Sequence, residues 1–461
     1  MTTGLTRRAL TEHRALAALA TPLALTQLAQ VALTTTDTVM LGRLGATALA
    51  GGGLAIVLFN QLRTMGVGLV TAVGNQVAAA VSRAETTGGV DGGSARDEVR
   101  DLVRAAVAVA TVAGVLGGLV MVGFGQLLGW LGQDAEVAAL TRTMLVTLAP
   151  GLLPCLWFQA LRQYSVGMRR PRALLVITLV SIVINAGLNL LLGFGAGSWP
   201  GLGVAGIGTA TSLVYLLTFG LLYRAVRRDP ELAPALSLAG WRASAPTVRR
   251  LLRLGFPIAA TYGSEAGFFS VVALVMGGFS AAALAAHTVV NQLVYIVFQA
   301  SVGASHGASI LVSREWAAGR RDTPARLART ALTQGALIVA AVAVVYLVAP
   351  GAMLGLFLDA TDPADAAALV VAGQLLMVAA VLQFADSAQN IGVGLLRGLD
   401  DTTGGFRATL IGYWLVGLPV ALVLGLPLGL GPVGVWLGLL TGLTATAALL
   451  LARYTRRLHR P

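Results

Sequence analysis

ALTTTDTVML, residues 32–41, places Asp37 near the far end of an apolar segment that begins around residue 15 and is long enough to cross a membrane. A carboxylate inside the hydrocarbon costs about 2.5 to 3.5 kcal/mol on insertion scales, so such residues usually face a bundle interior or a water-filled cavity. The three threonines before Asp37 carry hydroxyls that can donate hydrogen bonds to it. The stretch therefore predicts a membrane helix with a buried, functional acid.

The composition of the whole chain is that of a polytopic membrane protein. Of its 461 residues, 56% are hydrophobic and 11% are charged, and the mean hydropathy is +0.80. An ordinary soluble domain has about 25% charged residues. Long apolar runs bounded by polar or Gly/Pro clusters predict twelve spanning helices. They lie at residues 15–42, 48–81, 99–124, 137–167, 173–195, 202–224, 250–278, 283–312, 328–350, 366–396, 404–428 and 431–452.

The arginines predict the orientation of these spans. The N-terminal residues are polar and basic, and the apolar run after them is too long for a signal peptide, so we expect the first span to be retained. With the N-terminus in the cytoplasm, every arginine except Arg43, Arg63, Arg142 and Arg162 falls in or beside a segment that faces the cytoplasm. The positive-inside rule therefore predicts that both termini are cytoplasmic. The net charge of +12 follows this topology and does not indicate nucleic-acid binding.

Several chemistries are excluded by residue types that are missing or scattered. All 32 basic residues are arginine, so neither a Walker A lysine nor a Schiff-base lysine is present, and we expect no ATP hydrolysis by this chain. Cys155 is alone and cannot form an internal disulfide, and the four histidines lack metal-ligand spacing. We therefore expect no structural metal site and no cofactor.

The two halves of the chain resemble each other. GRLGATALAG (residues 42–51) is similar to GGFSAAALAA (277–286), and LGVAGIGTATS (202–212) is similar to LGPVGVWLGLL (430–440). Six spans in each half give both halves the same orientation. Parallel repeats of this kind imply a pseudo-twofold axis along the membrane normal, with a cavity between two lobes.

The longest polar connection separates the two sets of six spans, so it also marks the expected domain boundary. We predict an all-α fold with an N-terminal lobe at residues 1–228, a cytoplasmic linker at 229–249 and a C-terminal lobe at 250–461. The two six-helix lobes would surround a central cavity, an architecture that suits alternating access.

Two more acids lie inside predicted spans: Glu265 in the seventh and Asp386 in the tenth. Burial disfavours the charged form of a carboxylate, so such a group can hold a proton at neutral pH and release it when water or a cation enters. We therefore interpret the three acids as proton or cation sites. The alternative is pairing with the intramembrane arginines Arg63 or Arg162, which would only hold helices together.

Amides and aromatic rings add to the polar interior. Asn185 and Asn189 are four residues apart and share one helix face; they either bind a carboxylate or cation, or join helices with roughly 1 kcal/mol of hydrogen bonding. We assign a substrate cavity to Gln27, Gln61, Phe268, Phe269, Asn291, Gln292 and Gln389. The alternatives are packing contacts for the polar residues and a lipid-facing position for the two phenylalanines. His287 is expected at the membrane interface.

Three parts of the sequence carry a family resemblance: DTVMLGRLGATALAG (residues 37–51), PIAATYGSEAGFFSVVALVMGGF with ALAAHTVVNQ (257–292), and DSAQNIGVGLLRGLDDTT with YWLVGLP (386–419). They resemble the multidrug and toxic compound extrusion (MATE) transporters, most closely the NorM-type branch. The resemblance covers nearly the whole chain. It implies an antiporter of the bacterial inner membrane that exports cationic or amphipathic organic compounds in exchange for Na⁺ or H⁺.

The same resemblance implies roles for individual residues. Asp37 corresponds to the coupling acid of the N-terminal lobe, with Asn185 and Asn189 as its neighbours, while Glu265 and Asp386 correspond to a cation site that could hold Na⁺ in the C-terminal lobe. Gln292 stands where the family often has asparagine, so the C-terminal site departs from the family pattern. We expect a lipid-embedded monomer.

Two other functions remain as alternatives. A flippase for lipid-linked sugars resembles the same superfamily, but it would need a cavity lined with arginines for pyrophosphate. An intramembrane enzyme would need paired acids in a metal motif or a Ser/His dyad, and neither spacing occurs in the sequence.

Overall fold

The computed structural model describes residues 2–86, 92–131, 134–197, 199–359, 361, 363 and 365–459. In these ranges the chain is helical apart from its connections and one isolated β-bridge between Ala196 and Trp199. Twelve of the described helices are long and apolar enough to cross a membrane, which confirms the predicted all-α polytopic fold. Several begin before or end after the predicted apolar runs, because the helices continue into polar sequence.

The spanning elements follow one another along the chain with short connections. They are α1 (Thr2–Leu44), α2 (Ala46–Thr86), α3 (Gly92–Leu127), α4 (Ala135–Gly167), α5 (Arg172–Leu188) with η2 (Asn189–Phe194), α6 (Val204–Arg228), α7 (Ala245–Phe279), α8 (Ala281–Ala317), α9 (Thr323–Val348), α11 (Ala366–Gly398), α12 (Thr402–Leu410) with η5 (Ile411–Gly417) and α13 (Leu418–Gly425), and α14 (Gly431–Leu458). The short elements between them are η1 (Leu128–Leu131), η3 (Ala233–Ala235), η4 (Gly240–Arg242) and α10 (Pro350–Leu354).

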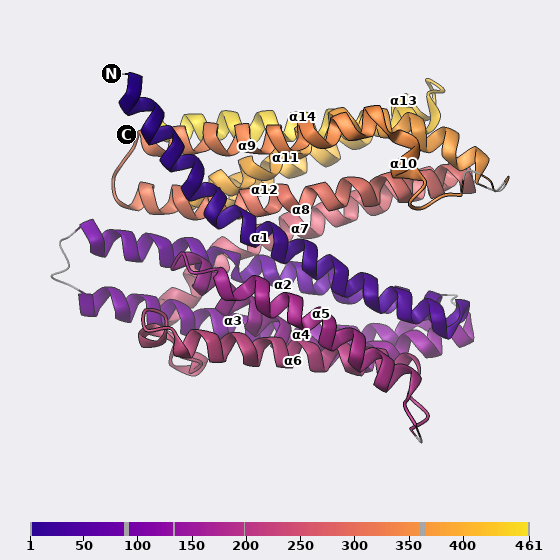
Figure 1. Cartoon of the computed structure of the whole chain (residues 1–461), viewed down its shortest axis with the longest axis horizontal. Helices are drawn as coiled ribbons and strands as arrows, with labels where there is room; N and C mark the ends of the chain where they lie inside the picture. The colour runs from indigo at the N-terminus through magenta and orange to yellow at the C-terminus, as the bar shows by residue number, and fades with distance from the viewer. Residues whose placement is uncertain are drawn as a thin grey trace. The chain divides into compact units, whose positions relative to one another are not determined.

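The chain forms two compact units, and two of its helices contribute to both. One unit comprises residues 25–259, and the other comprises residues 1–24 together with 260–461. The chain therefore passes between the units within α1 and again within α7. In each unit the helices lie side by side along a common direction (Figure 1).

In the unit of residues 25–259, α4 is the central helix. It packs against α2, α3 and α6, and 72% of the residues in its most apolar 18-residue stretch are buried. Small residues allow these close crossings, as at Gly151, where an added Cβ would lie 2.6 Å from the hydroxyl oxygen of Ser212 on α6. This is the packing expected when helices in lipid associate through small side chains.

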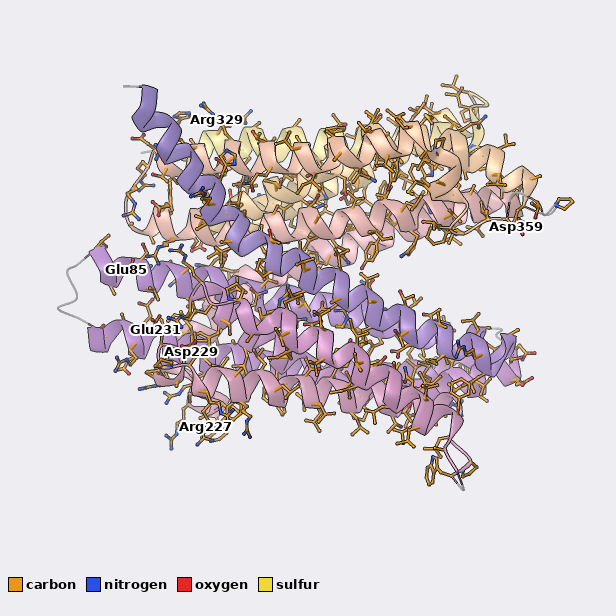
Figure 2. All side chains as sticks on the ribbon, viewed as in Figure 1. Glu85, Arg227, Asp229, Glu231, Arg329 and Asp359 are labelled. Atoms are coloured by element: carbon orange, nitrogen blue, oxygen red, sulfur yellow. The ribbon has the colours of Figure 1, made fainter. Side chains whose placement is uncertain are left out.

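In the other unit, α11 takes the central place and packs against α8, α9 and α14. Its core joins side chains of α7, α8, α11 and α14, among them the fully buried Phe268 and the buried Trp436. Arg329 and Asp359 lie at opposite ends of this unit (Figure 2). Charged residues thus lie at both ends of the bundle, with apolar helix between them.

Two of the spans change from α-helix to π-helix partway along. The π-helical segment η2 follows α5, and η5 lies between α12 and α13. π-helical turns are rare and are frequently found at functional sites, because the extra residue per turn displaces side chains from the α-helical register. Both segments carry or adjoin the residues that contact the predicted coupling acids.

Candidate functional site

Asp37 lies in α1 with 4% of its surface exposed, and neutral donors occupy both of its carboxylate oxygens. Asn189 donates from its side-chain amide to Oδ1 over 2.7 Å, and Thr211 on α6 donates from its hydroxyl to Oδ2 over 2.8 Å. Its contacts are therefore with neutral groups, and the alternative of an ion pair with Arg63 or Arg162 does not describe Asp37. Arg63 instead donates to Asn60, and Arg162 to Gln159.

The two asparagines form a fully buried pair beside this carboxylate. The amide nitrogen of Asn189 also donates to Oδ1 of Asn185 over 3.2 Å. In the described part of the chain, the amide nitrogen of Asn185 and the amide oxygen of Asn189 have no hydrogen-bond partner. Buried polar groups normally find partners, so the cluster retains one donor and one acceptor for a bound water or ion.

The hydroxyl that reaches Asp37 comes from a different helix than the sequence suggested. Thr34, Thr35 and Thr36 donate to backbone carbonyls four residues earlier in α1. Threonine within a helix commonly forms this local bond, so these hydroxyls, which could have donated to Asp37, bond to their own helix instead. Thr211 supplies the hydroxyl instead.

A small cavity adjoins the carboxylate within the same unit. Its polar lining includes Thr34, Asn60 and Tyr215 in addition to Asp37 and Thr211. Its volume is about 10 Å³, close to the space that one buried water requires. In this conformation the cavity therefore has room for a water molecule or a small cation, not for a drug-sized compound.

The acids of the second half lie on α7 and α11. Glu265 has its Oε1 3.4 Å from the hydroxyl of Tyr413, a residue of η5. Asp386 is 5% exposed and accepts a hydrogen bond from the amide of Asn390, one turn later, over 3.2 Å. The charges of Glu265 and Asp386 are close enough to act on each other, so the structure brings these two predicted residues together.

One arginine also acts on this pair of acids. Arg397, near the end of α11, is 5% exposed and donates to the hydroxyl of Tyr262 over 3.0 Å. Its charge acts favourably on Glu265. When both carboxyls are ionised, the two carboxylates and the one guanidinium carry a net charge of −1. Carboxylate, hydroxyl and amide oxygens are the donors that hard cations prefer.

No cluster of three or more His, Cys, Asp or Glu side chains suited to a metal occurs among the described residues. Any cation held by Glu265 and Asp386 would therefore need neutral oxygens to complete its shell. Gln389 is placed for this role, because it is buried beside Asp386 and its amide oxygen has no hydrogen-bond partner in the described part.

The predicted substrate-cavity residues have differing environments. Phe268 is fully buried and stacks on Tyr413 with ring centroids 4.9 Å apart, so its lipid-facing alternative is wrong. Phe269 packs against the same core. Gln389 is buried, whereas four other polar members are half-buried: Gln27 on α1, Gln61 on α2, and Asn291 and Gln292 on α8. The side-chain amide oxygen of Gln27 has no hydrogen-bond partner in the described part of the chain.

His287 is buried, in contrast to its expected interfacial position. It is 3% exposed and meets Trp436 edge to face, with ring centroids 5.8 Å apart. The position next to a short connection suggested exposure, but α8 turns this face toward the core of its unit.

Sequence reasoning missed two residues that contact the acids, Thr211 and Tyr413. The repeat contained a signal for the second. Tyr413 follows Glu265 by 148 residues, the same separation as between Asp37 and Asn185. The internal repeat therefore relates Asp37 to Glu265 and Asn185 to Tyr413, so a polar position close to the second acid could have been found by aligning the halves.

Comparison with known proteins relates the chain to membrane transporters. The MatE family model matches twice, at residues 22–191 and 257–423, which shows that the two halves are related to each other. "Probable multidrug resistance protein NorM" of Mesorhizobium japonicum is 34% identical, over 97% of this chain and 94% of that protein. The protein of the same name from Pseudomonas aeruginosa is 36% identical, over 95% and 88%.

Solved structures share the fold at lower sequence identity. A eukaryotic MATE transporter superposes with a TM-score of 0.83 and 19% identity, over 98% of each chain. A multidrug resistance MATE transporter in an outward-facing conformation superposes with a TM-score of 0.85 and 16% identity, over 97% of this chain and 96% of that one.

Proposed function

This chain belongs to the MatE family, which makes it a multi-pass membrane transporter and not an enzyme, and we propose that it exports cationic or amphipathic organic compounds in exchange for Na⁺ or H⁺. The nearly full-length likeness to proteins named for multidrug resistance supports this substrate class. We place the protein in the bacterial inner membrane with both termini in the cytoplasm. The distribution of arginines along the chain supports that orientation.

The neutral environment of Asp37 is the observation that carries the proposal. Asp37 is bound by two neutral donors and has no ion pair with the residues that the structure describes, so in a low-dielectric interior it gains most from a proton or a mobile cation. The adjoining cavity has the volume of one water-sized species. Asp37, Asn185 and Asn189 would thus bind the coupling ion, with Thr211 completing the site.

We assign the metal cation to Glu265 and Asp386 and the proton to Asp37. Glu265, Asp386 and Arg397 together carry a net charge of −1 when both acids are ionised, so a monovalent cation would then balance their charge. Gln389 and Tyr413 would supply neutral oxygens. In this division of labour, Asp37 couples proton binding to substrate release, and the Glu265 and Asp386 pair makes export respond to sodium.

Alternating access would link ion and substrate. Two six-helix lobes, built from the repeats, would rock around a central cavity, and we propose Gln27, Gln61, Phe269, Asn291, Gln292 and Gln389 for its lining; Phe268 is fully buried in the core and is left out. A ligand shifts a conformational equilibrium only by its differential affinity for the two states. Ion binding would favour one facing of the cavity and substrate binding the other, without covalent chemistry.

The flippase alternative is less well supported by the residues around the cavity. A lipid-linked pyrophosphate needs positive charge, whereas the described residues that line the cavity beside Asp37 include this acid and no arginine. A small coupling cation suits that lining better.

The proposal is tested by reconstituting the protein in vesicles and following a fluorescent cationic dye while sodium and proton gradients are imposed separately. We expect Asp37→Asn to abolish gradient-driven export and Asp359→Asn, an exposed acid in the connection after α10, to leave it unchanged. Export by Asp37→Asn at the wild-type rate and equal protein content would remove Asp37 from the coupling mechanism. Export without either gradient would contradict antiport.

A further inference from the structure

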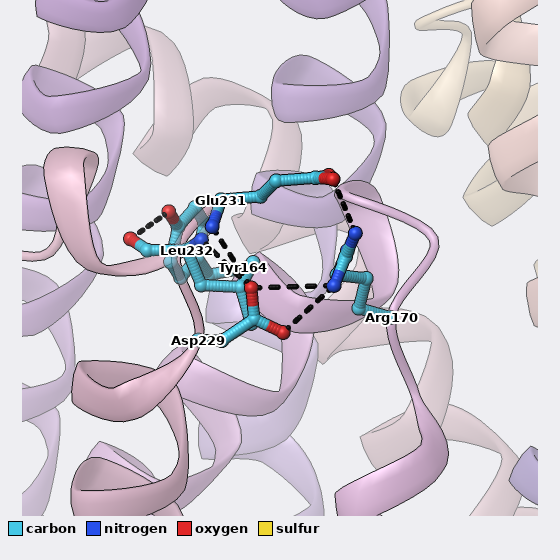
Figure 3. A network of polar contacts seen from close by, with 5 residues as sticks. All are labelled: Tyr164, Arg170, Asp229, Glu231 and Leu232. Atoms are coloured by element: carbon cyan, nitrogen blue, oxygen red, sulfur yellow. Dashed lines mark hydrogen bonds and ion pairs between the residues drawn. The ribbon is translucent and has the colours of Figure 1, made fainter.

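The linker between α6 and α7, residues 229–244, is fastened to the unit of residues 25–259 at its first residues. Arg170 forms ion pairs with Asp229 and Glu231 (Figure 3). The hydroxyl of Tyr164 donates to the carbonyl of Leu232 over 2.6 Å. Asp229 and Glu231 lie with Arg227 at one end of the helices of this unit (Figure 2). The linker therefore begins as an ordered, docked segment.

The rest of the linker is fastened to α3 by a second set of polar contacts. Arg100 donates to the carbonyl of Pro234 over 2.8 Å, and Arg104 donates to the hydroxyl of Ser237 over 3.0 Å. Asp101 accepts hydrogen bonds from both the backbone nitrogen and the hydroxyl of Ser244, at 2.9 and 2.6 Å. Arg100 and Arg104, two of the arginines that follow the positive-inside pattern, thus hold the linker against α3 through hydrogen bonds.

Three contacts with α3 also fix the depth of the linker along that helix. Ser237 meets Arg104, Gly240 meets Ala108, and Ser244 meets Asp101. A helix rises 1.5 Å per residue, so Ala108 is about 6 Å farther into the span than Arg104 and about 10 Å farther than Asp101. A Cβ at Gly240 would lie 3.0 Å from the backbone nitrogen of Ala108, so the linker and α3 approach each other closely here, and a side chain would push them apart by a few tenths of an ångström. The linker descends along α3, turns at Gly240 and returns.

The residue after this turning point is an exposed tryptophan. Trp241 has 84% of its surface exposed, and Arg242 beside it is also exposed. On the first turns of α7, Arg249 and Arg253 are four residues apart on one exposed face, with the 68% exposed Phe256 at the next turn. The side chains of these three arginines have no hydrogen bond or ion pair within the described ranges. They differ in this respect from the clamping arginines of α3.

We propose that the linker tip is an interfacial anchor: it inserts Trp241 at the level of the upper acyl chains of the cytoplasmic leaflet and binds the headgroup of an anionic phospholipid through Arg242. Tryptophan is enriched at this level of a membrane, and the descent of the linker matches the 5 to 10 Å depth of interfacial segments. Arg249 and Arg253 add positive charge to the same end of the unit. The inference rests on the proposed orientation of the chain, not on what it exports.

Charge and depth together favour a lipid over a soluble acidic partner. A soluble protein could neutralise Arg242, but Gly240, the residue before Trp241, meets α3 about one helical turn beyond Arg104, toward the middle of the span. An acyl chain next to an anionic headgroup matches both side chains at once. Each interfacial arginine contributes about fivefold to the local enrichment of anionic lipid.

The test places the full-length protein in phosphatidylcholine vesicles that contain spin-labelled phosphatidylglycerol or spin-labelled phosphatidylcholine. The fluorescence of Trp241 is obtained as the difference between the wild type and Trp241→Phe. We expect both lipids to quench it, phosphatidylglycerol several-fold more strongly, and Arg242→Gln to reduce that preference about fivefold. Trp130, 90% exposed in η1 after the far end of α3, is the matched control and should show no such preference.

Two results would overturn the inference. If neither labelled lipid quenched Trp241 while aqueous iodide did, the segment would not reach the membrane. If both lipids quenched it equally in the wild type, anionic-headgroup binding would be wrong. Arg227→Gln, at an exposed arginine of α6, controls for a general loss of surface charge and should keep the preference. These readings require no transport, so they are independent of the proposed antiport.

Discussion

Arg170 and Asp401 occupy the same position in two equivalent turns and carry opposite charges. Each follows a residue of positive φ, Arg169 at 59° and Asp400 at 58°, and each donates its backbone nitrogen to the carbonyl five residues earlier. Arg170 pairs with Asp229 just after α6, whereas Asp401 pairs with Arg453 and Arg457 at the end of α14. The repeat thus keeps an ion pair between the turn and the last helix of each half but reverses its polarity.

Asp401 has a second role as the N-cap of α12, and two substitutions separate the roles. It accepts a hydrogen bond from the backbone nitrogen of Gly404, and its side chain is 4% exposed. Asn keeps the cap and loses the charge, whereas Ala loses both. We expect Asp401→Ala to be less stable than Asp401→Asn by about 1 kcal/mol. Thermal unfolding can be followed with a thiol-reactive dye, because Cys155 is buried and is the single cysteine. Equal melting temperatures for the two variants would contradict the capping role.

Acid should weaken both ion pairs. Burial opposes the shift, but hydrogen bonds from Arg453 and Arg457 lower the pKa of Asp401, and hydrogen bonds from the backbone of Glu231 and from Arg170 lower the pKa of Asp229. A carboxyl with a lowered folded pKa stabilises the protein fully above its unfolded value of about 3.9, and this contribution is lost as the pH falls through the folded value. We therefore expect the melting temperature to decrease when the pH is lowered below about 4. The decrease in melting temperature with pH should be smaller in Asp401→Asn than in the wild type. Identical pH profiles for the two proteins would mean that the Asp401 carboxyl does not contribute to the acid sensitivity.

The spans and the acids were predictable from sequence because each depends on local information. An apolar run of sufficient length specifies a membrane helix, and an acid within it is conspicuous. The hydrogen-bond partner of Asp37 was not predictable in this way. Thr211 is 174 residues away, and neighbouring spans contain other threonines, such as Thr178 and Thr209, that bond only to their own backbone. Only the tertiary structure, which brings Thr211 of α6 to Asp37 of α1, selects this threonine.

The π-helical segments and the docked linker also escaped prediction. NLLLGF and IGYWLVG carry no pattern that distinguishes a π-helix from an α-helix, since one extra residue per turn leaves the segment apolar throughout. The linker looked like a simple polar connection. Its path depends on Arg100 and Arg104, which the charge pattern assigned to topology alone, and on the closeness of Gly240 to Ala108.

Thr211 can be tested with a matched pair of variants on α6. Thr211→Val removes the hydroxyl that binds Oδ2 of Asp37, whereas Thr209→Val removes a hydroxyl that bonds to the carbonyl of Ala205. A hydrogen bond to a charged group contributes about 1.5 to 3 kcal/mol, so its loss makes the charged form of Asp37 less stable. We expect the pH dependence of dye export to move toward higher pH in Thr211→Val by about one unit or more. Thr209→Val should keep the wild-type profile, and a common profile for all three proteins would exclude Thr211 from the coupling site.

Tyr413 provides the corresponding test in the second half, because Tyr413→Phe alters only the group that faces Glu265. The ring should stay stacked on Phe268, with centroids 4.9 Å apart in the wild type, so the core is preserved. The lost hydroxyl lies 3.4 Å from Oε1 of Glu265. If it helps to hold a cation there, the sodium concentration for half-maximal export should rise about two- to tenfold, the equivalent of 0.5 to 1.5 kcal/mol. Tyr346→Phe is the control, because this buried tyrosine contacts Gln383 and no acid. A sodium dependence that is unchanged in Tyr413→Phe while Glu265→Gln abolishes it would mean that the hydroxyl serves packing alone. An effect on sodium dependence with the proton dependence intact would instead separate the two halves by ion, with Asp37 responding to protons and the Glu265 and Asp386 pair to the metal cation.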